Sequence, residues 1–344
     1  MVETTVEAEG LSQPPLIIRG NLEDFLPGNG SIEVERLGDG HSNATFVVKR
    51  EEKMWVLRRP PRPPYPPKAH DVLREAAILE SLEQAAVPVP RVAQICEDEN
   101  VIGAPFYLME KMPGFVIRDE IPEGLPENPG EAIGESLISG LATIHGVDWK
   151  KHGFPAKGNG EGYLERQVAL WGAQWVRNRT REVPVIDEVG RRLAGRIPAS
   201  GAPTIVHGDY KLDNVLFSED EFPKLTAVLD WEMATVGDPI ADLGFLTATW
   251  LGPNGDPDNM VGLSRATASP SFPTAAWLAD RYSELTGRDL GALGWYEALA
   301  LWKLAILLEG SYRRFIEGTD DDPFFARLES GVPHLGDLAL DRLS

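Results

Sequence analysis

Three polar side chains in the second half of the chain have the types and the spacing that phosphoryl transfer requires. Asp209 and Asn214 lie five residues apart in the segment His-Gly-Asp-Tyr-Lys-Leu-Asp-Asn, and Asp230 follows sixteen residues later, after an apolar run. Transfer of phosphate from Mg-ATP to a hydroxyl needs one carboxylate beside the attacking hydroxyl. It also needs an amide oxygen and a second carboxylate that hold metal on the phosphates. The pattern therefore indicates a phosphotransferase site.

The two segments that carry these residues resemble the motifs of a known family. The first follows the pattern His-Gly-Asp-x-x-x-x-Asn, and the second contains Leu-Asp-Trp. On these motifs the chain is identified as a member of the aminoglycoside phosphotransferase family, also called the phosphotransferase enzyme family. This family is the small-molecule branch of the protein-kinase-like fold, and the chain resembles most the branch joined in some animals to acyl-CoA dehydrogenase domains. The resemblance covers about residues 25–330.

The resemblance implies a role for each reactive residue of the two motifs. Asp209 is expected to be the catalytic base, or to orient the acceptor hydroxyl, because positioning dominates in a loose transition state. Asn214 and Asp230 are expected to bind Mg²⁺ through oxygen. Lys211 lies where many kinases have a lysine that contacts the γ-phosphate, although a solvated lysine is the alternative.

Three further residues near the motifs are expected to support the loop or are left without a role. His207 is expected to pack beneath the catalytic loop and to hydrogen-bond its backbone. Asp242, in Gly-Asp-Pro-Ile-Ala-Asp-Leu-Gly, is expected to brace the same backbone and not to react. Asp213 fits either a place near the metal or an ordinary surface position.

A glycine-rich segment in the first part of the chain is a candidate for phosphate binding. It reads Gly-Asp-Gly-His-Ser-Asn and lies between two candidate strands. Glycine allows the backbone to approach phosphate closely and to adopt positive φ. A plain hairpin turn is the alternative, since asparagine stands in place of the third glycine of the usual pattern. The residues expected to bind nucleotide here are Gly38, Gly40, Ser42 and Asn43.

The strand that follows should provide a basic residue for the α- and β-phosphates of the nucleotide. Arg58 falls where kinases have a lysine, and Glu75 is its expected partner on the next helix. Arginine can bind phosphate, but it is not interchangeable with lysine. The register is open between Arg58 and its neighbour Arg59. Glu110 and Met112, near the end of a later strand, are expected to present backbone groups to the adenine.

The hydrophobic pattern changes along the chain from strands to helices. β-branched and aromatic runs predict strands within 32–57 and at 104–110, and the stripe of apolar residues after Asp71 predicts a helix. Further helices are expected at 132–145, 161–180 and 274–317, the last in two or three pieces. The predicted fold is therefore α+β and protein-kinase-like, with a small β-rich N-lobe and a larger, mainly helical C-lobe.

These elements predict three regions. Residues 1–24 are expected to form an N-terminal arm, 25–112 the nucleotide-binding N-lobe, and 113–344 the catalytic and substrate-binding C-lobe. The break at Pro113-Gly114 marks the hinge, because proline and glycine interrupt a strand.

The composition excludes several classes of protein. A hydrophobic content of 42%, with nine Trp and twelve Phe, is enough for a packed core. The net charge of −20 argues against nucleic acid as a partner, because phosphates require a basic face. The negative net charge is consistent with an ordinary soluble surface, and also with the attraction of a polycationic substrate. The sequence leaves the oligomeric state open.

The expected location is the cytoplasm, with no membrane partner. A single cysteine, Cys96, cannot form an internal disulfide, as expected in a reducing compartment. No apolar run approaches the roughly 20 residues that span a bilayer. The N-terminal segment also lacks the basic start and apolar stretch of a signal peptide.

Taken with the resemblance, these observations predict an enzyme that uses ATP and Mg²⁺ to phosphorylate a hydroxyl group of a small molecule. The alternative is a nucleotide-binding module of the pseudokinase type, without turnover, which arginine at position 58 keeps open. A protein kinase is disfavoured, because Gly237-Asp-Pro follows Asp230 after few residues and leaves no activation segment.

The sequence leaves two classes of phosphate acceptor open, an aminoglycoside and a hydroxyacyl-type metabolite. An aminoglycoside pocket needs converging carboxylates, for which Glu309 and the run Asp320–Asp322 are candidates. A neutral or anionic acceptor fits the aromatic and basic side chains of the second half better. These candidates are Trp171, Trp175, Trp250, Trp295, Tyr296, Trp302, Tyr312 and the pair Arg313 and Arg314.

Overall fold

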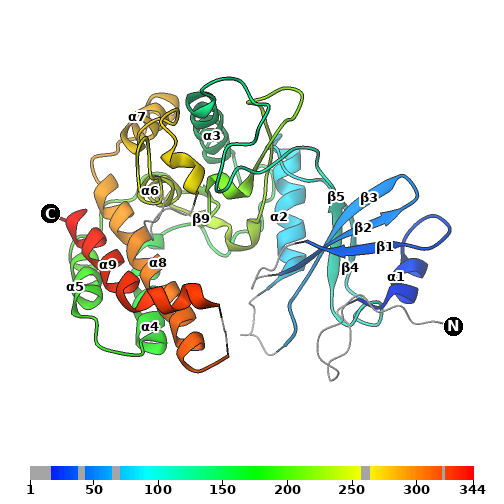
Figure 1. Cartoon of the computed structure of the whole chain (residues 1–344), viewed down its shortest axis with the longest axis horizontal. Helices are drawn as coiled ribbons and strands as arrows, with labels where there is room; N and C mark the ends of the chain where they lie inside the picture. Colours follow the sequence, from blue (N-terminus) through cyan, green and yellow to red (C-terminus); the bar gives the residue numbers. More distant parts are fainter. Residues whose placement is uncertain (1–16, 38–42, 64–69, 257–263, 320–321) are drawn as a thin grey trace. The chain divides into compact units, whose positions relative to one another are not determined.

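Alternating apolar residues in the first part of the chain form an antiparallel sheet. The computed structural model describes residues 17–37, 43–63, 70–256, 264–319 and 322–344. The strands of this sheet run in the order β1-β2-β3-β5-β4 (Figure 1). They are β1 (Glu33–Arg36), β2 (Ala44–Arg50), β3 (Lys53–Arg59), β4 (Val92–Cys96) and β5 (Phe106–Glu110).

The register of the sheet follows from the alternation of its side chains. In β2, Ala44, Phe46 and Val48 are buried in the core, whereas the residues between them are less covered. Phe46 pairs with Leu57 of β3, and Leu57 pairs with Leu108 of β5. Because side chains alternate between faces, this register turns Leu57 and Arg58 to opposite sides of β3.

Helix α1 (Arg19–Phe25) belongs to the same core. Leu22 is completely buried, and Ile17 before the helix is 2% exposed. Arg50 of β2 donates hydrogen bonds to the carbonyl oxygens of Leu26 and Glu23, both at 2.8 Å. The sequence predicts an N-terminal arm for residues 1–24. From Ile17 onward, this segment is instead packed against the sheet.

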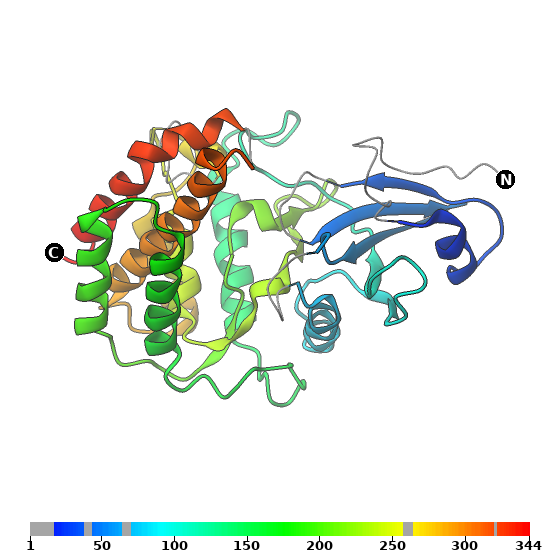
Figure 2. The same cartoon turned by 90° about the horizontal axis from the view of Figure 1, so that it is seen from below.

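Helix α2 (Val72–Gln84) begins where the sequence predicts it. The carboxylate of Asp71 accepts a hydrogen bond from the backbone N–H of Arg74 at 3.0 Å, which caps the helix N-terminus. Buried apolar residues such as Val72, Ala76 and Leu79 pack the helix against β4 and β5 (Figure 2). The helix thus carries Glu75 on its buried face.

Helices dominate the second part of the chain, and α8 (Leu293–Ile316) is their centre. It packs against α4 (Tyr163–Asn178), α5 (Pro184–Gly195), α6 (Ile240–Ala248) and α9 (Leu328–Asp341). Helix α3 (Gly130–His145) packs against α7 (Ala275–Thr286). The predicted helices at 132–145, 161–180 and 274–317 are confirmed, the last as α7 and α8. Short 3₁₀ turns lie at η3 (Arg265–Ala268) and η4 (Pro323–Arg327).

The segment that contains the two sequence motifs is built from short strands and turns. Strand β6 (Thr204–Val206) pairs antiparallel with β9 (Thr235–Gly237), so the residues after β6 lie close to the start of α6. Between these strands lie η1 (Leu212–Asn214), β7 (Val215–Phe217), β8 (Leu225–Val228) and η2 (Trp231–Met233).

The chain divides into two compact units. The first, called here the N-terminal unit, contains the described residues up to Pro113 together with Lys150–Pro155 and Thr226–Glu232. The second, the C-terminal unit, contains Gly114–Trp149, Ala156–Leu225 and Met233–Ser344. The expected kinase-like α+β fold, with a β-rich and a mainly helical part, is confirmed. The sequence predicts a single boundary at residue 112. It does not predict that the two later segments belong to the N-terminal unit. None of the described helices has the length and apolar character needed to cross a bilayer.

Candidate functional site

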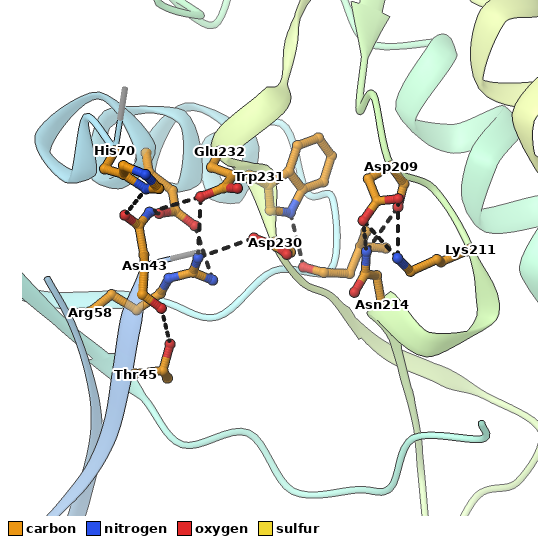
Figure 3. A network of polar contacts seen from close by, with 12 residues as sticks. Asn43, Thr45, Arg58, His70, Asp209, Lys211, Asn214, Asp230, Trp231 and Glu232 are labelled. Atoms are coloured by element: carbon orange, nitrogen blue, oxygen red, sulfur yellow. Dashed lines mark hydrogen bonds and ion pairs between the residues drawn. The ribbon is translucent and has the colours of Figure 1, made fainter. Parts of the chain in front are cut away.

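The carboxylate of Asp209 is fixed by two side chains of its own loop (Figure 3). The ammonium of Lys211 lies 2.9 Å from Oδ2 and 3.2 Å from Oδ1. The amide nitrogen of Asn214 donates to the same Oδ2 and to the Asp209 carbonyl oxygen, both at 2.9 Å. The Asp209 side chain is still 23% exposed. The carboxylate is thus held in one orientation and remains accessible to a reactant.

Asp242 of α6 holds the loop from below, as the sequence predicts. Its Oδ2 accepts hydrogen bonds from the backbone N–H of His207 at 2.7 Å and from His145 Nε2 at 3.2 Å. Its Oδ1 accepts from the Gly208 N–H at 2.8 Å. Burial opposes the charge of Asp242, but the hydrogen bond from His145 and those from the loop backbone keep its pKa below the ordinary value. His207 Nδ1 in turn accepts from the Asp209 N–H at 3.2 Å, which confirms its structural role.

Only glycine fits at position 208. Gly208 has φ of +89°, and a Cβ there would lie 3.0 Å from the Met233 Cβ and 3.2 Å from its carbonyl oxygen. A side chain at this position would therefore face both backbone strain and a steric clash.

In the N-terminal unit, the guanidinium of Arg58 lies among three carboxylates (Figure 3). Its distances are 3.3 Å to Glu75 of α2, 3.1 Å to Asp230 and 3.9 Å to Glu232. The predicted pairing of Arg58 with Glu75 is therefore confirmed. Arg59 donates to the carbonyl oxygens of Pro60 and Ile102, so the pairing with Glu75 favours Arg58 for the predicted position.

Burial and neighbouring charge shift the pKa of the two most buried members of this cluster, Glu75 and Arg58. Burial raises the pKa of Glu75 to about 7, Arg58 partly offsets this, and Asp230 and Glu232 raise it further. Burial also disfavours the charge of Arg58, but the carboxylates, Glu75 foremost, raise its pKa above the ordinary value.

Asp230 adopts an unusual backbone conformation. Its φ is +63°, a left-handed value that costs most non-glycine residues about 1–3 kcal/mol. The turn is anchored by Trp231, whose buried indole N–H donates to the Val228 carbonyl oxygen at 2.9 Å. Strain that is held in place by packing is typical of functional positions.

The glycine-rich segment is only partly described. Gly38, Gly40 and Ser42 lie outside the described residues, so their predicted role is not tested. Asn43 is described and belongs to the carboxylate cluster: its amide nitrogen donates to Glu75 at 3.2 Å and to Glu232 at 3.0 Å. Its amide oxygen lies 3.1 Å from His70 Nδ1.

At the end of β5, where the sequence predicts backbone contacts with adenine, Glu110 is paired within the sheet. The Glu110 N–H donates to the Arg91 carbonyl oxygen at 2.9 Å, and the Glu110 carboxylate pairs with the Arg91 side chain. Within the described part of the chain, the backbone of Met112 makes no hydrogen bond. Met112 is therefore the better of the two candidates for a backbone contact with a base.

Two oxygen atoms have the character expected of Mg²⁺ ligands. Asn214 uses its amide nitrogen to hold Asp209, and its Oδ1 accepts no hydrogen bond from any residue described. Asp230 Oδ1 accepts a hydrogen bond from Arg58, and Asp230 Oδ2 accepts none from any residue described. No three Asp, Glu, His or Cys side chains of the described residues form a metal cage. Each oxygen by itself is of the type that Mg²⁺ prefers, since Mg²⁺ is usually bound by one or two protein groups together with phosphates.

Most of the aromatic residues proposed from the sequence as acceptor contacts are structural instead. The indole nitrogens of Trp175, Trp250, Trp295 and Trp302 donate to Asp187, Pro273, Leu193 and Ile186. The Tyr296 hydroxyl donates to Asp238, and Arg313 binds Glu317 and the Arg177 carbonyl oxygen. These side chains are therefore held by contacts within the protein, and their role as acceptor contacts stays a prediction.

The described acidic residues that the sequence suggests for binding an aminoglycoside also have structural contacts. Glu309 is completely buried and accepts hydrogen bonds from the N–H and hydroxyl of Thr180 at 3.0 and 2.7 Å. Asp322 caps η4, and residues 320–321 lie outside the described part. Glu309 is thus a structural residue and does not offer its carboxylate to a cationic substrate.

Sequence reasoning missed two charged residues near the site. Glu232 completes the cluster around Arg58, and its place directly after Asp-Trp was a usable signal. Lys303 of α8 lies in a hollow beside Gly208 and Asp242. A lysine within a helix gives no sequence signal of this kind.

Removal of the Arg58 guanidinium is expected to destabilise the protein at pH 7. Arg58→Ala leaves the buried carboxylate of Glu75 without its cation, and breaking a buried ion pair in this way costs about 3–5 kcal/mol. The loss should shrink at pH 5, where Glu75, with a wild-type pKa of about 7, is protonated and needs no partner. Urea unfolding at both pH values measures the free energy of unfolding.

The double variant Arg58→Ala/Glu75→Gln provides the control for this prediction. It removes the buried charge along with its partner, so it should be more stable at pH 7 than Arg58→Ala and should lack most of the pH effect. Equal unfolding free energies for Arg58→Ala and the wild type at pH 7 would contradict the account of the cluster.

Comparisons with known proteins support the motif analysis. A family model described as "Phosphotransferase enzyme family" matches residues 33–279. Acyl-CoA dehydrogenase family member 11 of Rattus norvegicus is 33% identical over 307 residues, which are 87% of this chain and 39% of that protein. The chain thus spans about two fifths of the length of that relative. The resemblance to the acyl-CoA dehydrogenase-associated branch is confirmed.

Solved structures show the same fold. A protein described as a putative aminoglycoside phosphotransferase from Ralstonia eutropha JMP134 superposes with a TM-score of 0.78 at 29% identity, covering 94% of this chain and 97% of that one. An aminoglycoside phosphotransferase variant in a ternary complex with AMP-PNP and hygromycin B superposes with a TM-score of 0.61. It is 18% identical, with 94% of this chain and 98% of that one covered.

Proposed function

Because the chain belongs to the phosphotransferase enzyme family, we propose that it transfers the γ-phosphate of ATP to a hydroxyl group of a small molecule, with Mg²⁺ as cofactor. The observation that carries this proposal is the Asp209 carboxylate, which is oriented by Lys211 and Asn214 and is still accessible. A carboxylate with only a structural role would be expected to be covered. The bound AMP-PNP of the structural neighbour supports ATP as the donor.

In the proposed reaction, the acceptor hydroxyl oxygen forms a bond to the γ-phosphorus. The bond between that phosphorus and the β–γ bridging oxygen breaks, ADP leaves, and the hydroxyl proton passes to Asp209. Because the transition state of phosphoryl transfer is loose, Asp209 acts mainly by fixing the direction of the hydroxyl. Lys211 is proposed to contact the γ-phosphate oxygens when nucleotide is bound.

The remaining residues are proposed to bind nucleotide and metal. Asn214 and Asp230 hold Mg²⁺ through the two oxygens that have no partner in the described protein, and Mg²⁺ neutralises charge on the phosphates. Arg58, positioned by Glu75, binds the α- and β-phosphates. Backbone groups of the glycine-rich segment (Gly38, Gly40, Ser42 and Asn43) and of the end of β5 (Glu110 and Met112) complete the nucleotide site.

One observation favours a second candidate function, a nucleotide-binding module without turnover. Arg58 stands where active kinases have lysine, and it contacts Asp230 Oδ1, an atom of the proposed metal ligand. A module of this kind would bind ATP but would form no phosphorylated product. It would have no need of an accessible and oriented Asp209, which is why we favour the enzyme.

For the acceptor, we propose a neutral or anionic hydroxylated metabolite, with hydroxyacyl compounds as the first class to test. The burial of Glu309 removes one carboxylate that an aminoglycoside would need. The relationship to the branch named for acyl-CoA dehydrogenases supports the hydroxyacyl class. The competing hypothesis is an aminoglycoside, as the net charge of −20 and the described neighbours would suggest.

A single screen tests this choice of acceptor. ATP consumption is measured at equal concentrations of aminoglycosides, sugars, choline-like alcohols and hydroxyacyl-CoAs. We expect saturable turnover with a hydroxyacyl compound and little with the aminoglycosides. Efficient phosphorylation of a kanamycin-type compound, without any response to the hydroxyacyl compounds, would restore the antibiotic-modifying hypothesis.

A further inference from the structure

Asn43 belongs to a closed ring of polar contacts in the N-terminal unit (Figure 3). Its amide nitrogen donates to Glu75 Oε2 at 3.2 Å and to Glu232 Oε2 at 3.0 Å. Arg58 contacts the same two carboxylates, with Nη1 3.3 Å from Glu75 Oε1 and Nη2 3.9 Å from Glu232 Oε2. We call these four side chains the polar ring. Each carboxylate in it lies between an amide and a guanidinium.

The polar ring joins segments that are far apart in the sequence. Asn43 is the last residue of the glycine-rich segment, Arg58 lies on β3, and Glu75 lies on α2. Glu232 belongs to η2 and follows Asp230 closely in the chain. Arg58 Nη2 also lies 3.1 Å from Asp230 Oδ1. Through the polar ring, the Asn43 side chain therefore connects the segment proposed to bind phosphate with the carboxylate proposed to bind metal.

The neighbours of Asn43 determine how its amide is oriented. Carboxylate oxygens accept hydrogen bonds, so the amide nitrogen, with its two hydrogens, must face Glu75 and Glu232. The amide oxygen then lies 3.1 Å from His70 Nδ1. Because an amide oxygen only accepts, Nδ1 of His70 carries the proton of this hydrogen bond. Asn43 is 5% exposed, and both ends of its amide are thus bound by the protein.

Two departures from the usual kinase pattern meet in the polar ring. Position 43 corresponds to the third glycine of that pattern, and position 58 corresponds to its lysine. Glycine has no side chain, so it would leave Glu75 Oε2 and Glu232 Oε2 without the Asn43 donor. The guanidinium of Arg58 is a rigid planar fork, so its orientation depends on where both carboxylates lie. The asparagine at position 43 and the arginine at position 58 are therefore linked.

We propose that Asn43 is a positioning residue: its amide holds the two carboxylates of the polar ring, and they in turn orient the Arg58 guanidinium toward the phosphates of ATP. The inference rests on the proposed function and adds a residue to its nucleotide site. The Asn43 side chain acts through its neighbours and does not touch the nucleotide itself. Binding of ATP should therefore depend on this side chain. Binding of adenosine, which has no phosphate for Arg58 to contact, should not.

Asn43→Asp is the first variant. Aspartate has the size of asparagine, but it presents an acceptor oxygen where asparagine donates two hydrogens to carboxylates. With Mg²⁺ present, the Kd for ATP should rise by about ten- to a hundredfold, because the charge-assisted hydrogen bonds that hold the polar ring are lost. The Kd for adenosine should stay unchanged, which also shows that the variant is folded. Calorimetric titration with each ligand measures both constants.

Two further single variants separate the side chain from the backbone at this position. Asn43→Gly restores the glycine of the kinase pattern, so it keeps any contact that the backbone makes with phosphate. We expect it to weaken ATP binding as well, since it removes the amide. Asn21→Asp makes the same change at an exposed position of the same unit, where the amide donates to the Asn100 carbonyl oxygen. It should alter neither Kd.

Exchange of the amide and the carboxylate across one contact provides a test by rescue. Asn43→Asp/Glu232→Gln keeps the net charge of the wild type, and the new glutamine amide can donate to the new aspartate. The double variant should recover about tenfold of the ATP affinity that Asn43→Asp loses, as expected for side chains in contact. Glu232→Gln completes the double-mutant cycle. A residue that merely supported the fold would show no such recovery.

These measurements distinguish failure of this inference from failure of the proposed function. If Asn43→Asp weakens ATP binding and the exchange restores it, but the wild type phosphorylates no acceptor, the positioning role stands and the phosphotransferase proposal fails. If the wild type is active, and both Asn43→Asp and Asn43→Gly bind ATP as tightly as it does, Asn43 has no positioning role. Equal losses of ATP and adenosine affinity, without recovery in the double variant, would likewise overturn the inference.

Discussion

Asp209→Asn is expected to lower turnover by about 10²–10⁴-fold and to leave the affinity for ATP nearly unchanged. Asparagine has the same shape as aspartate, so the loop that Asp242 braces should keep its conformation. It cannot accept the proton of the acceptor, and it removes the charge that holds Lys211. The measurements are kcat with any accepted substrate and calorimetric titration with ATP.

The same substitution at a neighbouring aspartate provides the control. Asp213 lies in the same loop, but its carboxylate accepts a hydrogen bond from Ser264 and, within the described structure, makes none with the side chains of Lys211 and Asn214. Asp213→Asn should therefore cost much less turnover than Asp209→Asn. Near-normal turnover of Asp209→Asn would mean that the base lies elsewhere.

Asp230→Ala should remove the contribution of Mg²⁺ to ATP binding. For the wild type, Mg²⁺ should tighten ATP binding measurably, because Asp230 Oδ2 and Asn214 Oδ1 are the proposed metal ligands. Loss of one charged ligand is expected to weaken Mg-ATP binding by about ten- to a hundredfold. Titration with ATP in the presence and absence of Mg²⁺ measures both affinities.

Glu232→Gln is the matched control, because it also removes a carboxylate from the cluster around Arg58 but has no proposed metal role. It should retain the effect of Mg²⁺. If ATP binding ignores Mg²⁺ and also survives Asp230→Ala, the metal assignment is wrong.

The contacts within the loop of Asp209 could be predicted from the sequence because they depend on local spacing. The loop from His207 to Asn214 returns on itself, so Asn214 reaches the carbonyl oxygen and carboxylate of Asp209 from five residues away. Helices were equally predictable where an N-cap and an apolar stripe coincide, as at Asp71. In these segments, the local pattern and the tertiary packing favour the same structure.

Other features depend on contacts between distant segments, and the sequence alone did not give them. Arg58 and Arg59 are both buried, and only the pairing of β3 with its neighbours shows which of them faces Glu75. The tryptophans expected to line a pocket pack in the core, because their indole N–H groups find backbone and carboxylate partners from other helices. The contact of Lys303 with the Trp171 ring likewise joins residues more than a hundred positions apart in the chain.

The most direct test of the central claim is the fate of the γ-phosphate itself. ATP labelled with ¹⁸O in the γ-phosphate is incubated with the protein, Mg²⁺ and a pool of hydroxylated metabolites, and the products are analysed by mass spectrometry. The account predicts a labelled phosphate monoester that requires Mg²⁺ and is nearly absent with Asp209→Asn. Normal ATP binding without any labelled monoester, or equal amounts of it from Asp209→Asn and the wild type, would contradict the account.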